Sequence, residues 1–348
     1  MSKPLLTVGM ATYDEYDSTW STLSTLRLQL RTLLPNNHEF VVINNHPDGK
    51  DTPALVELMK PIRNGKLIAH SRQGTGSRQK IFEHANGVFT LCIDCHISID
   101  FAGLTRLISF ISTRQRTNDL YHGVLLLNDF VTRETHMEPI WRDKMFGAWG
   151  SDARRFGEEA FEIPMHGLGL FLCRTEAWPG FNPLFRGFGG EEGYIHFKFR
   201  NRGDKTWCLP WLEWVHKFRN KRPTPYVNKL SDRIYNYFVG WHEVGEPEQS
   251  IIDHFSKFMK LSAIQSIQQQ AHADWAAYVN NKIIPEVQEI TPGKTTSLAA
   301  VRQMANYVVG LPLDQRQRFI TELKRTDSRV YKMLETQLKF LQAAAQRR

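Results

Sequence analysis

Three short clusters of acidic and histidine residues could do chemistry, and the first is Asp94-Cys95-His96. It ends an apolar run, residues 88–94, that is typical of a buried strand. Side chains two residues apart on an extended chain face the same side, so Asp94 and His96 are expected to converge. A carboxylate with an imidazole suits Mn²⁺ or a similar divalent ion, which can hold the phosphates of a nucleotide. Such a pair is also common on ordinary protein surfaces, so it does not decide the function alone.

The second cluster is Glu191-Glu192, which follows Gly189-Gly190 and begins a helix-like run over residues 192–200. Glycines let the backbone pass close to a ligand, and acids at a helix start are stabilised by the helix dipole. One of the two carboxylates is a candidate to accept the proton of an acceptor hydroxyl. The alternative is an acidic helix start that only caps the helix.

The third cluster is His216, which ends an aromatic-rich strand pattern and precedes a basic segment over residues 217–222. His216 is a candidate third metal ligand, and the basic residues are candidates to hold a diphosphate or an anionic acceptor. The alternative is a strand that ends in a solvated basic loop.

The elements that must position these residues alternate between strands and helices. We predict strands over 5–12, 39–45, 67–70 and 88–94, and helices over 18–34, 53–60 and 76–86. This alternation predicts βαβ units and a mostly parallel sheet, in which ligands bind beyond the carboxyl ends of the strands. The polar segments 12–14 (Thr-Tyr-Asp), Asn44-Asn45 and 94–96 all fall at that edge.

The chain changes character near residue 249. Helix-like stretches cover 251–276, 275–287, 297–309 and 314–345, with breaks expected at Pro285, Pro292-Gly293 and residues 310–312. Residues 249–348 hold 14 Lys and Arg against 8 Asp and Glu, whereas the first 248 hold 30 against 28. We therefore predict a domain over 1–245 and a basic helical domain over 249–348, which has either a polyanionic partner or only a solvated basic face.

The cysteines and the apolar runs indicate the compartment. Cys92 and Cys95 form a C-x-x-C inside a strand pattern, and with Cys173 and Cys208 they are too scattered for a disulfide framework. We interpret them as reduced core or site-wall thiols, with a redox or metal role as the alternative. The chain begins without a signal-peptide pattern and has no membrane-spanning apolar run, so a cytoplasmic protein is expected.

The order of the three clusters resembles that of GT-A glycosyltransferases of the family-2 type over residues 5–245. Within that superfamily the chain most resembles the catalytic domain of polypeptide N-acetylgalactosaminyltransferases. Residues 7–14 resemble the nucleotide-binding first strand and its loop, residues 72–78 resemble N-x-G-x-x-x-A-R, and 94–96 match D-x-H. Residues 167–172 resemble the strand that lines the sugar pocket, 188–192 resemble W-G-G-E-N, and 215–223 resemble H-V-F-R with its basic proline run.

The resemblance implies an α/β fold: a Rossmann-like mixed sheet flanked by helices, of the GT-A (nucleotide-diphospho-sugar transferase) type. It also implies a hexosyltransferase that uses Mn²⁺ (or Mg²⁺) and a UDP-sugar donor. The implied metal ligands are Asp94, His96 and His216, and the implied catalytic acids are Glu191 and Glu192. The implied donor-binding residues are Thr12, Tyr13, Asp14, Asn44, Asn45, Gly74, Arg78, Asp94, Gly169 and Arg219.

These clusters do not indicate which acceptor receives the sugar. A cytosolic chain, a basic C-terminal part and a basic loop after His216 favour nucleic acid, because Lys and Arg supply most sequence-independent DNA affinity. Trp141, Trp149 and Trp211 are candidates to stack an extruded base, although packing is the commoner use of Trp. The chain also looks similar to bacteriophage glycosyltransferases that decorate hydroxymethylated pyrimidines, such as hydroxymethylcytosine, in DNA; these act in the host cytoplasm.

We therefore expect transfer of a hexose onto a 5-hydroxymethylpyrimidine in DNA. Two alternatives stay open. One is a glycosyltransferase that acts on a protein or a cell-envelope polysaccharide with the same donor site. The other is a catalytically inactive GT-A-like module that binds nucleic acid.

Overall fold

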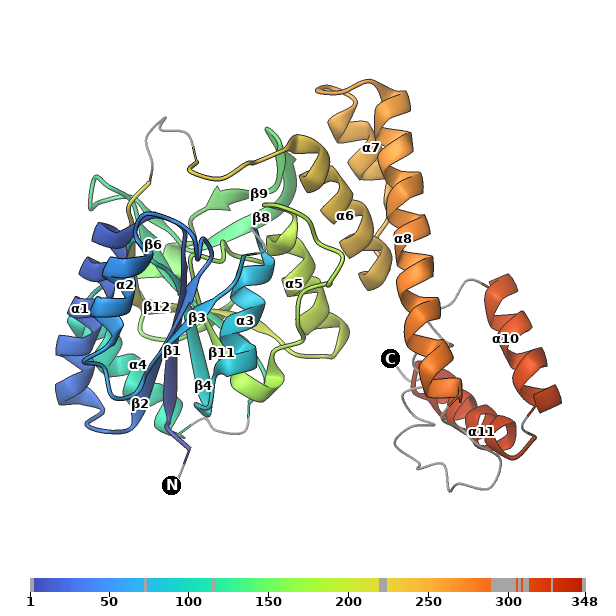
Figure 1. The fold of residues 1–348 in the computed structure, drawn as a ribbon, viewed down its shortest axis with the longest axis horizontal. Helices are drawn as coiled ribbons and strands as arrows, with labels where there is room; N and C mark the ends of the chain where they lie inside the picture. The colour runs from blue at the N-terminus through green and yellow to red at the C-terminus, as the bar shows by residue number, and fades with distance from the viewer. Residues whose placement is uncertain are drawn as a thin grey trace. The chain divides into compact units, whose positions relative to one another are not determined.

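The computed structural model describes residues 3–71, 74–113, 117–218, 224–288, 305, 308, 313–326 and 328–345. Its centre is a mixed sheet in which ten strands of these residues take part. The main path runs β10-β12-β6-β11-β4-β1-β2-β3, with β5 paired to β12 and β7 to β6 (Figure 1). The chain thus has the α/β class that the alternation of elements predicted.

The first half of the sheet is built from parallel strands joined by helices. Its strands are β1 (Leu6–Thr12), β2 (His38–Asn44), β3 (Gly65–Ala69) and β4 (Phe89–Asp94), joined by α1 (Tyr16–Leu33), α2 (Thr52–Met59) and α3 (Gly76–His84). Every one of these elements begins and ends within two residues of its predicted position. The prediction succeeded because strands covered on both faces read as continuous apolar runs.

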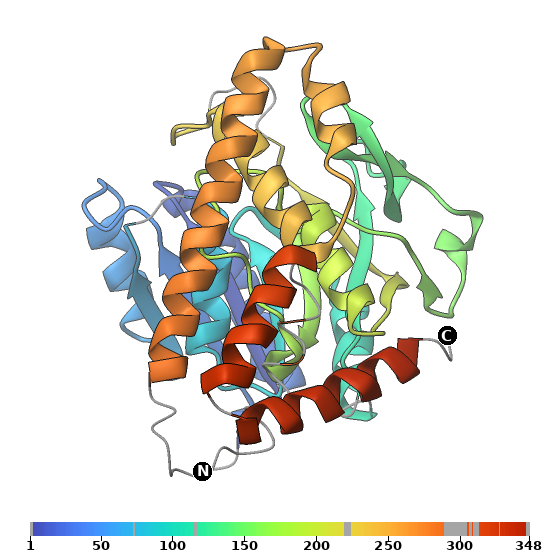
Figure 2. The ribbon, with the colours of Figure 1, turned by 90° about the vertical axis from the view of Figure 1, so that its right-hand side faces the viewer.

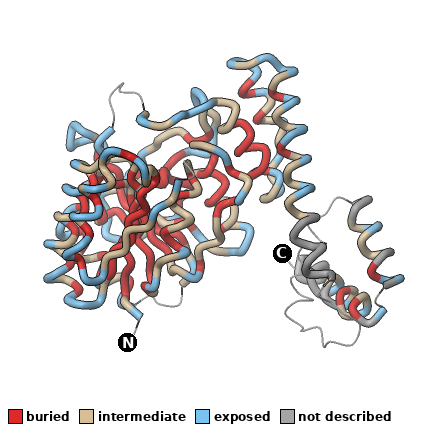
Figure 3. Tube along the Cα trace, viewed as in Figure 1, coloured by how far each residue is buried: buried red, intermediate tan, exposed pale blue. Residues whose placement is uncertain are grey.

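Helices cover both faces of the sheet, and each face has its own core. One core joins the sheet to α1 and to α4 (Phe101–Thr113), with Leu23 and Leu107 fully buried. The other joins it to α3, α5 (Glu191–Asn201) and α6 (Leu230–Val244), with Ile81 and Tyr194 fully buried. Figure 3 shows the strands as the most buried part of the chain.

The second half of the sheet adds strands of both directions. They are β5 (Ile97–Ile99), β6 (Leu120–Leu126), β7 (Arg133–Glu134), β10 (Phe161–Glu162), β11 (Leu170–Arg174) and β12 (Thr206–His216). β11 lies antiparallel between β4 and β6, and β12 lies parallel to β6. A separate hairpin, β8 (His136–Arg142) with β9 (Met145–Gly150), and two short 3₁₀ turns, η1 (Ala153–Phe156) and η2 (Thr175–Ala177), complete this half.

An irregularity in β12 determines where His216 lies. The pairing with β6 shifts register between Leu209 and Glu213, a stretch that contains Pro210. Proline has no N–H to donate to a neighbouring strand, so a bulge is the usual outcome. Beyond the bulge β12 also pairs with β5, and His216 stands opposite Ile97. The bulge therefore places His216 opposite Ile97, which directly follows His96, so the two histidines lie close together.

The structure divides into two compact units, residues 1–275 and 276–348. α7 (Gln249–Phe255) and the first part of α8 (Leu261–Gln288) belong to the first unit, where Ile251, Phe255 and Ile264 join the core of α5 and α6. Figure 2 shows α7 and α8 as an antiparallel pair joined by a short turn. The predicted boundary between 245 and 249 falls within this unit, and the assignment of the two predicted domains stays a prediction.

The predicted helix over 251–276 is wrong in its continuity, because α7 ends at Phe255 and α8 begins at Leu261. A straight helix of this length would span about 39 Å, too far for Ile251 and Ala271 to reach one core. The break expected at Pro285 is also wrong, since this residue lies within α8.

The second unit is helical in its described part. α10 (Leu313–Thr326) and α11 (Ser328–Ala345) pack through a small core that includes Leu323, Val330 and Leu334. The predicted stretch 297–309 lies outside the described residues except for Ala305 and Val308, which join the same core. Among the helices of the described ranges, none has the length and apolar character needed to cross a membrane.

Three buried histidines lie side by side in the core behind the sheet. His122 and His196 bring their Nε2 atoms within 3.1 Å, and His166 stacks on His122 with ring centroids 4.7 Å apart. Burial lowers the pKa of His166 to about 4 and of His196 to about 3, and lowers that of His122 well below its usual value. All three are therefore neutral in the folded protein at neutral pH.

These histidines should make the protein sensitive to mild acid. Below pH about 6.5 these histidines bind protons in the unfolded chain but stay neutral in the folded chain. The free energy of unfolding should therefore fall from pH about 6.5 towards pH 4. For His166 the loss amounts to roughly 3 kcal/mol across that window. Urea denaturation at a series of pH values should show the loss, and His166→Phe should flatten the curve. His84→Gln, a change at a less buried histidine in the last turn of α3, should leave it as steep; equal slopes in all three proteins would contradict the assignment.

Candidate active site

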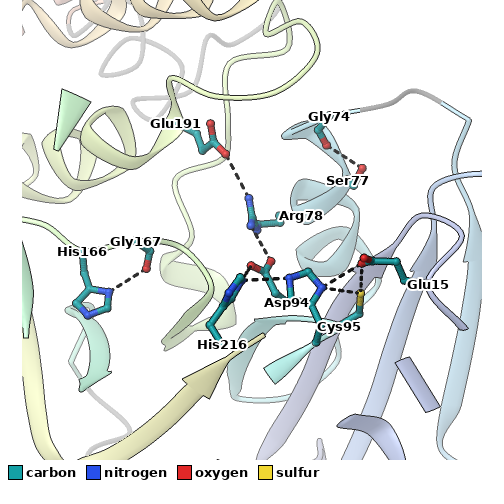
Figure 4. Close-up of polar contacts among 11 residues, drawn as sticks. Glu15, Gly74, Ser77, Arg78, Asp94, Cys95, His166, Gly167, Glu191 and His216 are labelled. Atoms are coloured by element: carbon teal, nitrogen blue, oxygen red, sulfur yellow. Dashed lines mark hydrogen bonds and ion pairs between the residues drawn. The ribbon is translucent and has the colours of Figure 1, made fainter. Parts of the chain in front are cut away.

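Asp94, His96 and His216 converge on one point, although 120 residues separate the two histidines. Asp94 ends β4, His96 precedes β5 and His216 ends β12. The two histidine Nε2 atoms are 3.1 Å apart, and His216 Nε2 is 3.4 Å from Asp94 Oδ2. One donor atom from each residue lies within 4.8 Å of the other two (Figure 4). This arrangement offers an oxygen and two nitrogens to a single cation.

Glu15 orients His96, and the sequence clusters did not indicate it. Glu15 lies in the loop after β1, and its Oε2 accepts hydrogen bonds from His96 Nδ1 at 3.0 Å and from Cys95 Sγ at 3.3 Å. A histidine that donates from Nδ1 presents the lone pair of Nε2 when it is neutral, as metal-binding histidines do. The position of Glu15, directly after the predicted polar segment 12–14, is the feature of the sequence that could have indicated it.

The electrostatics of the cluster favour a bound cation. Burial lowers the pKa of His96, but hydrogen bonds with Cys95 and Glu15 and the charge of Asp94 raise it overall, to about 10. Burial raises the pKa of Asp94, but Arg78 and His216 hold it well below its usual range. The cluster therefore attracts positive charge, and a proton and a divalent ion compete for its donor atoms.

Arg78 links the cluster of Asp94, His96 and His216 to the acids of α5. Its Nη2 donates to Asp94 Oδ1 at 2.8 Å and its Nη1 to Glu191 Oε1 at 3.3 Å (Figure 4). Both carboxylates raise the pKa of Arg78 despite its burial, so the guanidinium stays charged. One buried cation thus sets the distance between the two parts of the site.

Glu191 and Glu192 begin α5, as the sequence predicted, after Gly189 and Gly190 with φ of 99° and 93°. These positive φ values are those that glycine adopts without strain. Glu191 is fully buried, and its Oε2 has no partner among the described residues. Burial, together with the neighbouring carboxylate of Glu192, raises the pKa of Glu191. A carboxylate with one free oxygen and a raised pKa is suited to receive a hydroxyl or its proton.

The predicted nucleotide residues after β1 form an aromatic and polar wall. The Tyr13 ring stacks on His46 at 4.6 Å, and Tyr226 meets its edge at 5.6 Å. Asp14 has a φ of 48°, and its Oδ2 lies 2.7 Å from His46 Nδ1. The sequence did not single out His46 or Tyr226, because neither belongs to a cluster of acids and histidines.

Three other predicted polar residues hold the surrounding loops. Thr12 is buried and its Oγ1 accepts a hydrogen bond from Thr19 in α1. Asn44 donates to Thr52 Oγ1 at 2.7 Å, which joins β2 to α2. Asn45 donates to the His70 carbonyl at 2.7 Å and accepts from Ser77 at 2.6 Å, next to Arg78.

Gly74 and Gly169 lie where the backbone passes close to another group. A Cβ at Gly74 would lie 1.7 Å from the carbonyl oxygen of Gly187, and the φ of Gly74 is 112°. A Cβ at Gly169 would lie 2.8 Å from the Trp214 ring and 3.3 Å from Asp94 Oδ2. Gly74 therefore lets two backbone segments meet, and Gly169 lets the backbone approach Trp214 and Asp94.

The remaining sequence candidates lie elsewhere or outside the described part. Arg219, Arg222 and the residues 72–73 of the predicted donor loop lie outside the described residues. Trp141 packs among Phe146, Trp241 and other aromatic rings in the core. Trp211 packs on Phe110 and under Arg106, whereas Trp149 lies against His166 and Gly167, near the site.

The hydrogen bond from His96 to Glu15 leads to a test by metal binding. Glu15→Gln should weaken Mn²⁺ binding by about 10–100-fold, because the imidazole loses the carboxylate that orients it and makes it more basic. Asp17→Asn, a change at an exposed acid two residues away in α1, is the control. Calorimetric titration with Mn²⁺ measures both; equal affinities for the two variants would contradict the role of Glu15.

No protein family model and no curated protein matches the chain. Among solved structures it is similar to GalNAc-T7, crystallised with UDP, GalNAc and Mn²⁺, with a TM-score of 0.53 and 15% identity. That match covers 82% of this chain and 58% of GalNAc-T7, so the chain spans less than two thirds of that protein. A further match is residues 1–349 of S. aureus TarS, with a TM-score of 0.46, 12% identity and coverage of 97% and 91%. The likeness to GalNAc-T7 shows the fold, and the predicted GT-A-type mixed sheet flanked by helices is confirmed.

Proposed function

We propose that the chain is a glycosyltransferase that moves a hexose from a UDP-sugar to an acceptor hydroxyl. The observation that carries the proposal is the convergence of Asp94, His96 and His216 at the carboxyl ends of the strands. Open α/β sheets bind their ligands at this edge. The similarity in fold to GalNAc-T7, which was crystallised with UDP, GalNAc and Mn²⁺, supports the same donor chemistry.

The three donor atoms fit a divalent ion. Mixed oxygen and nitrogen ligands suit Mn²⁺, with Mg²⁺ as the alternative, and Glu15 already holds His96 with Nε2 towards the cluster. A bound ion would neutralise the charge that develops on the departing diphosphate. Asp94 stays ionised beside Arg78, so its carboxylate is ready to act as a ligand.

The residues around this cluster are suited to bind the nucleobase, the sugar and the reacting hydroxyl. Tyr13, with His46 and Tyr226 beside it, offers ring surface to a nucleobase, and Asp14 and Asn45 lie on the same side of the sheet. Gly169 lets the backbone before β11 pass close to Trp214 and Asp94, where a side chain would crowd the Asp94 carboxylate. Glu191, with its free Oε2, binds a hydroxyl of the donor or acceptor and receives its proton, while Glu192 keeps the pKa of Glu191 high.

For the acceptor we propose a 5-hydroxymethylpyrimidine in DNA. The second unit supports this, because exposed cations occur along its two described helices: Arg318, Lys324, Arg325, Lys332 and Lys339. Lys and Arg that neutralise phosphates supply affinity for DNA that does not depend on sequence. An anionic cell-envelope polymer would meet the same charges, and a catalytically inactive DNA-binding module would use them without transfer, so the tests below distinguish the three.

Replacement of the proposed ligands tests the donor site. Asp94→Ala and His216→Ala should each lower Mn²⁺-dependent UDP-sugar turnover by at least about 100-fold, because assistance to the leaving diphosphate is worth several kcal/mol. Glu57→Ala, at an exposed acid of α2, is the control. Release of UDP in the presence of Mn²⁺ measures turnover. Full activity in both ligand variants would rule out the metal assignment, and a wild-type protein that binds DNA without turnover would favour the inactive module.

The acceptor needs a separate experiment. Radiolabelled UDP-glucose and UDP-N-acetylgalactosamine are incubated with hydroxymethylated duplex DNA, with plain duplex DNA, and with protein and lipid-linked polysaccharide fractions. We expect label on hydroxymethylated DNA alone, and DNA binding that weakens steeply with salt. Label found only in the protein or polysaccharide fractions would overturn the DNA proposal and leave the donor site intact.

A further inference from the structure

A second group of potential metal ligands lies outside the proposed active site, where three helices meet. His242 is in the last turn of α6, Glu248 directly precedes α7, and His272 is in α8. Glu248 Oε1 lies 3.2 Å from His242 Nδ1 and 2.9 Å from His272 Nε2. All three residues belong to the unit of residues 1–275, so their arrangement is internal to one compact body.

The spacing of these atoms fits a small tetrahedral cation. A zinc ion with bonds of about 2.0–2.1 Å holds its ligand atoms roughly 3.3 Å apart, close to the observed separations from Glu248. One donor atom from each residue lies within 4.8 Å of the others, so a shift of the two imidazoles would complete the shell. Two histidines and one glutamate are a known zinc-binding set that leaves a fourth position for water.

The surroundings support a ligand role for the carboxylate. Gln268 Nε2 donates to Glu248 Oε2 at 2.7 Å, which orients the carboxylate as outer hydrogen bonds do at metal sites. The side chains of His242 and His272 are 35% and 41% exposed, so an ion and its water can enter from solvent. Glu248 is the most enclosed of the three, at 15%.

We propose that His242, Glu248 and His272 bind Zn²⁺ and that the ion clamps α6, α7 and α8 together. α6 packs on α5, the helix that begins with Glu191, so the clamp stabilises the support of the proposed acid. Zinc ligands from three separate helices stabilise the folded state because the unfolded chain does not hold them in place. This inference does not depend on the proposed glycosyltransferase activity.

The test measures zinc content with the first metal site silenced. Protein without an affinity tag is stripped with a chelator, dialysed against Zn²⁺ and analysed by inductively coupled plasma mass spectrometry. The background is Asp94→Ala with His96→Ala and His216→Ala, which also breaks the neighbouring group of Glu15, Cys95 and His96, and His272→Gln is added to it. We expect one equivalent of zinc in the background protein and none after His272→Gln. Asp253→Asn, an exposed acid of α7 outside the cluster, should keep the full equivalent.

Thermal unfolding gives a second readout that needs no activity. Zinc at about 100 times its dissociation constant should raise the Tm of the background protein by roughly 5 °C, and should not raise that of the His272→Gln protein. If His272→Gln does not fold, Glu248→Gln replaces it, because the amide keeps the shape of the side chain and is a poor zinc ligand. The proposal fails if the folded variant retains its zinc. It also fails if the background protein binds no zinc and its Tm does not change, because the three side chains are then only hydrogen-bonded to one another.

Discussion

Asp94 must remain ionised although protein surrounds it, and several features of the site meet this requirement. Isolated buried charge is costly, and such a carboxylate persists only with close partners of opposite charge. Arg78 supplies a direct ion pair at 2.8 Å, while His216 and His96 approach from the other side. Arg78 also reaches Glu191, so the same cation that keeps Asp94 charged fixes the place of α5. Loss of Arg78 would therefore disturb the proposed metal ligands and the proposed acid together.

The sheet brings the partners of Asp94 to it from distant parts of the chain. β1 and β4 are adjacent and parallel, so the loop after β1 places Glu15 beside Cys95 and His96. β12 arrives after its bulge at Pro210 and pairs with β5, which sets His216 against His96. The bulge thus has a definite consequence: in a regular ladder with β6, His216 would follow a different register. A bulge that re-aims a side chain next to a site is a common use of this irregularity.

The helices of α5–α8 connect the proposed site to the rest of the molecule. α5 presents Glu191 at its N-terminus and packs on α6, and α6, α7 and α8 share one core with it. A zinc clamp at the outer end of this group would stiffen the elements behind the acid without touching a substrate. The second unit, residues 276–348, carries exposed cations along α10 and α11, whereas Asp94, Glu15 and Glu191 make the proposed site acidic.

Local sequence patterns were enough to locate the strands and helices of the first half of the sheet and the polar residues at the strand ends. Buried parallel strands read as apolar runs, and the polar residues that end strands mark the binding edge, so Asp94, His96 and His216 could be named as candidates from their positions. The catalytic role of Glu191 was implied by the resemblance, because spacing alone equally fits an acidic helix start. Which groups meet depends on the folded chain: Glu15 contacts His96, Arg78 lies between Asp94 and Glu191, and His242, Glu248 and His272 gather around one point. The turn between α7 and α8 also depends on packing. The helical periodicity of the sequence continues through it, but the chain folds back so that both helices join one core. Local sequence patterns indicate which side of each segment is buried. Contacts such as that of Glu15 with His96 join residues far apart in the chain, and the distances between them depend on how the elements pack.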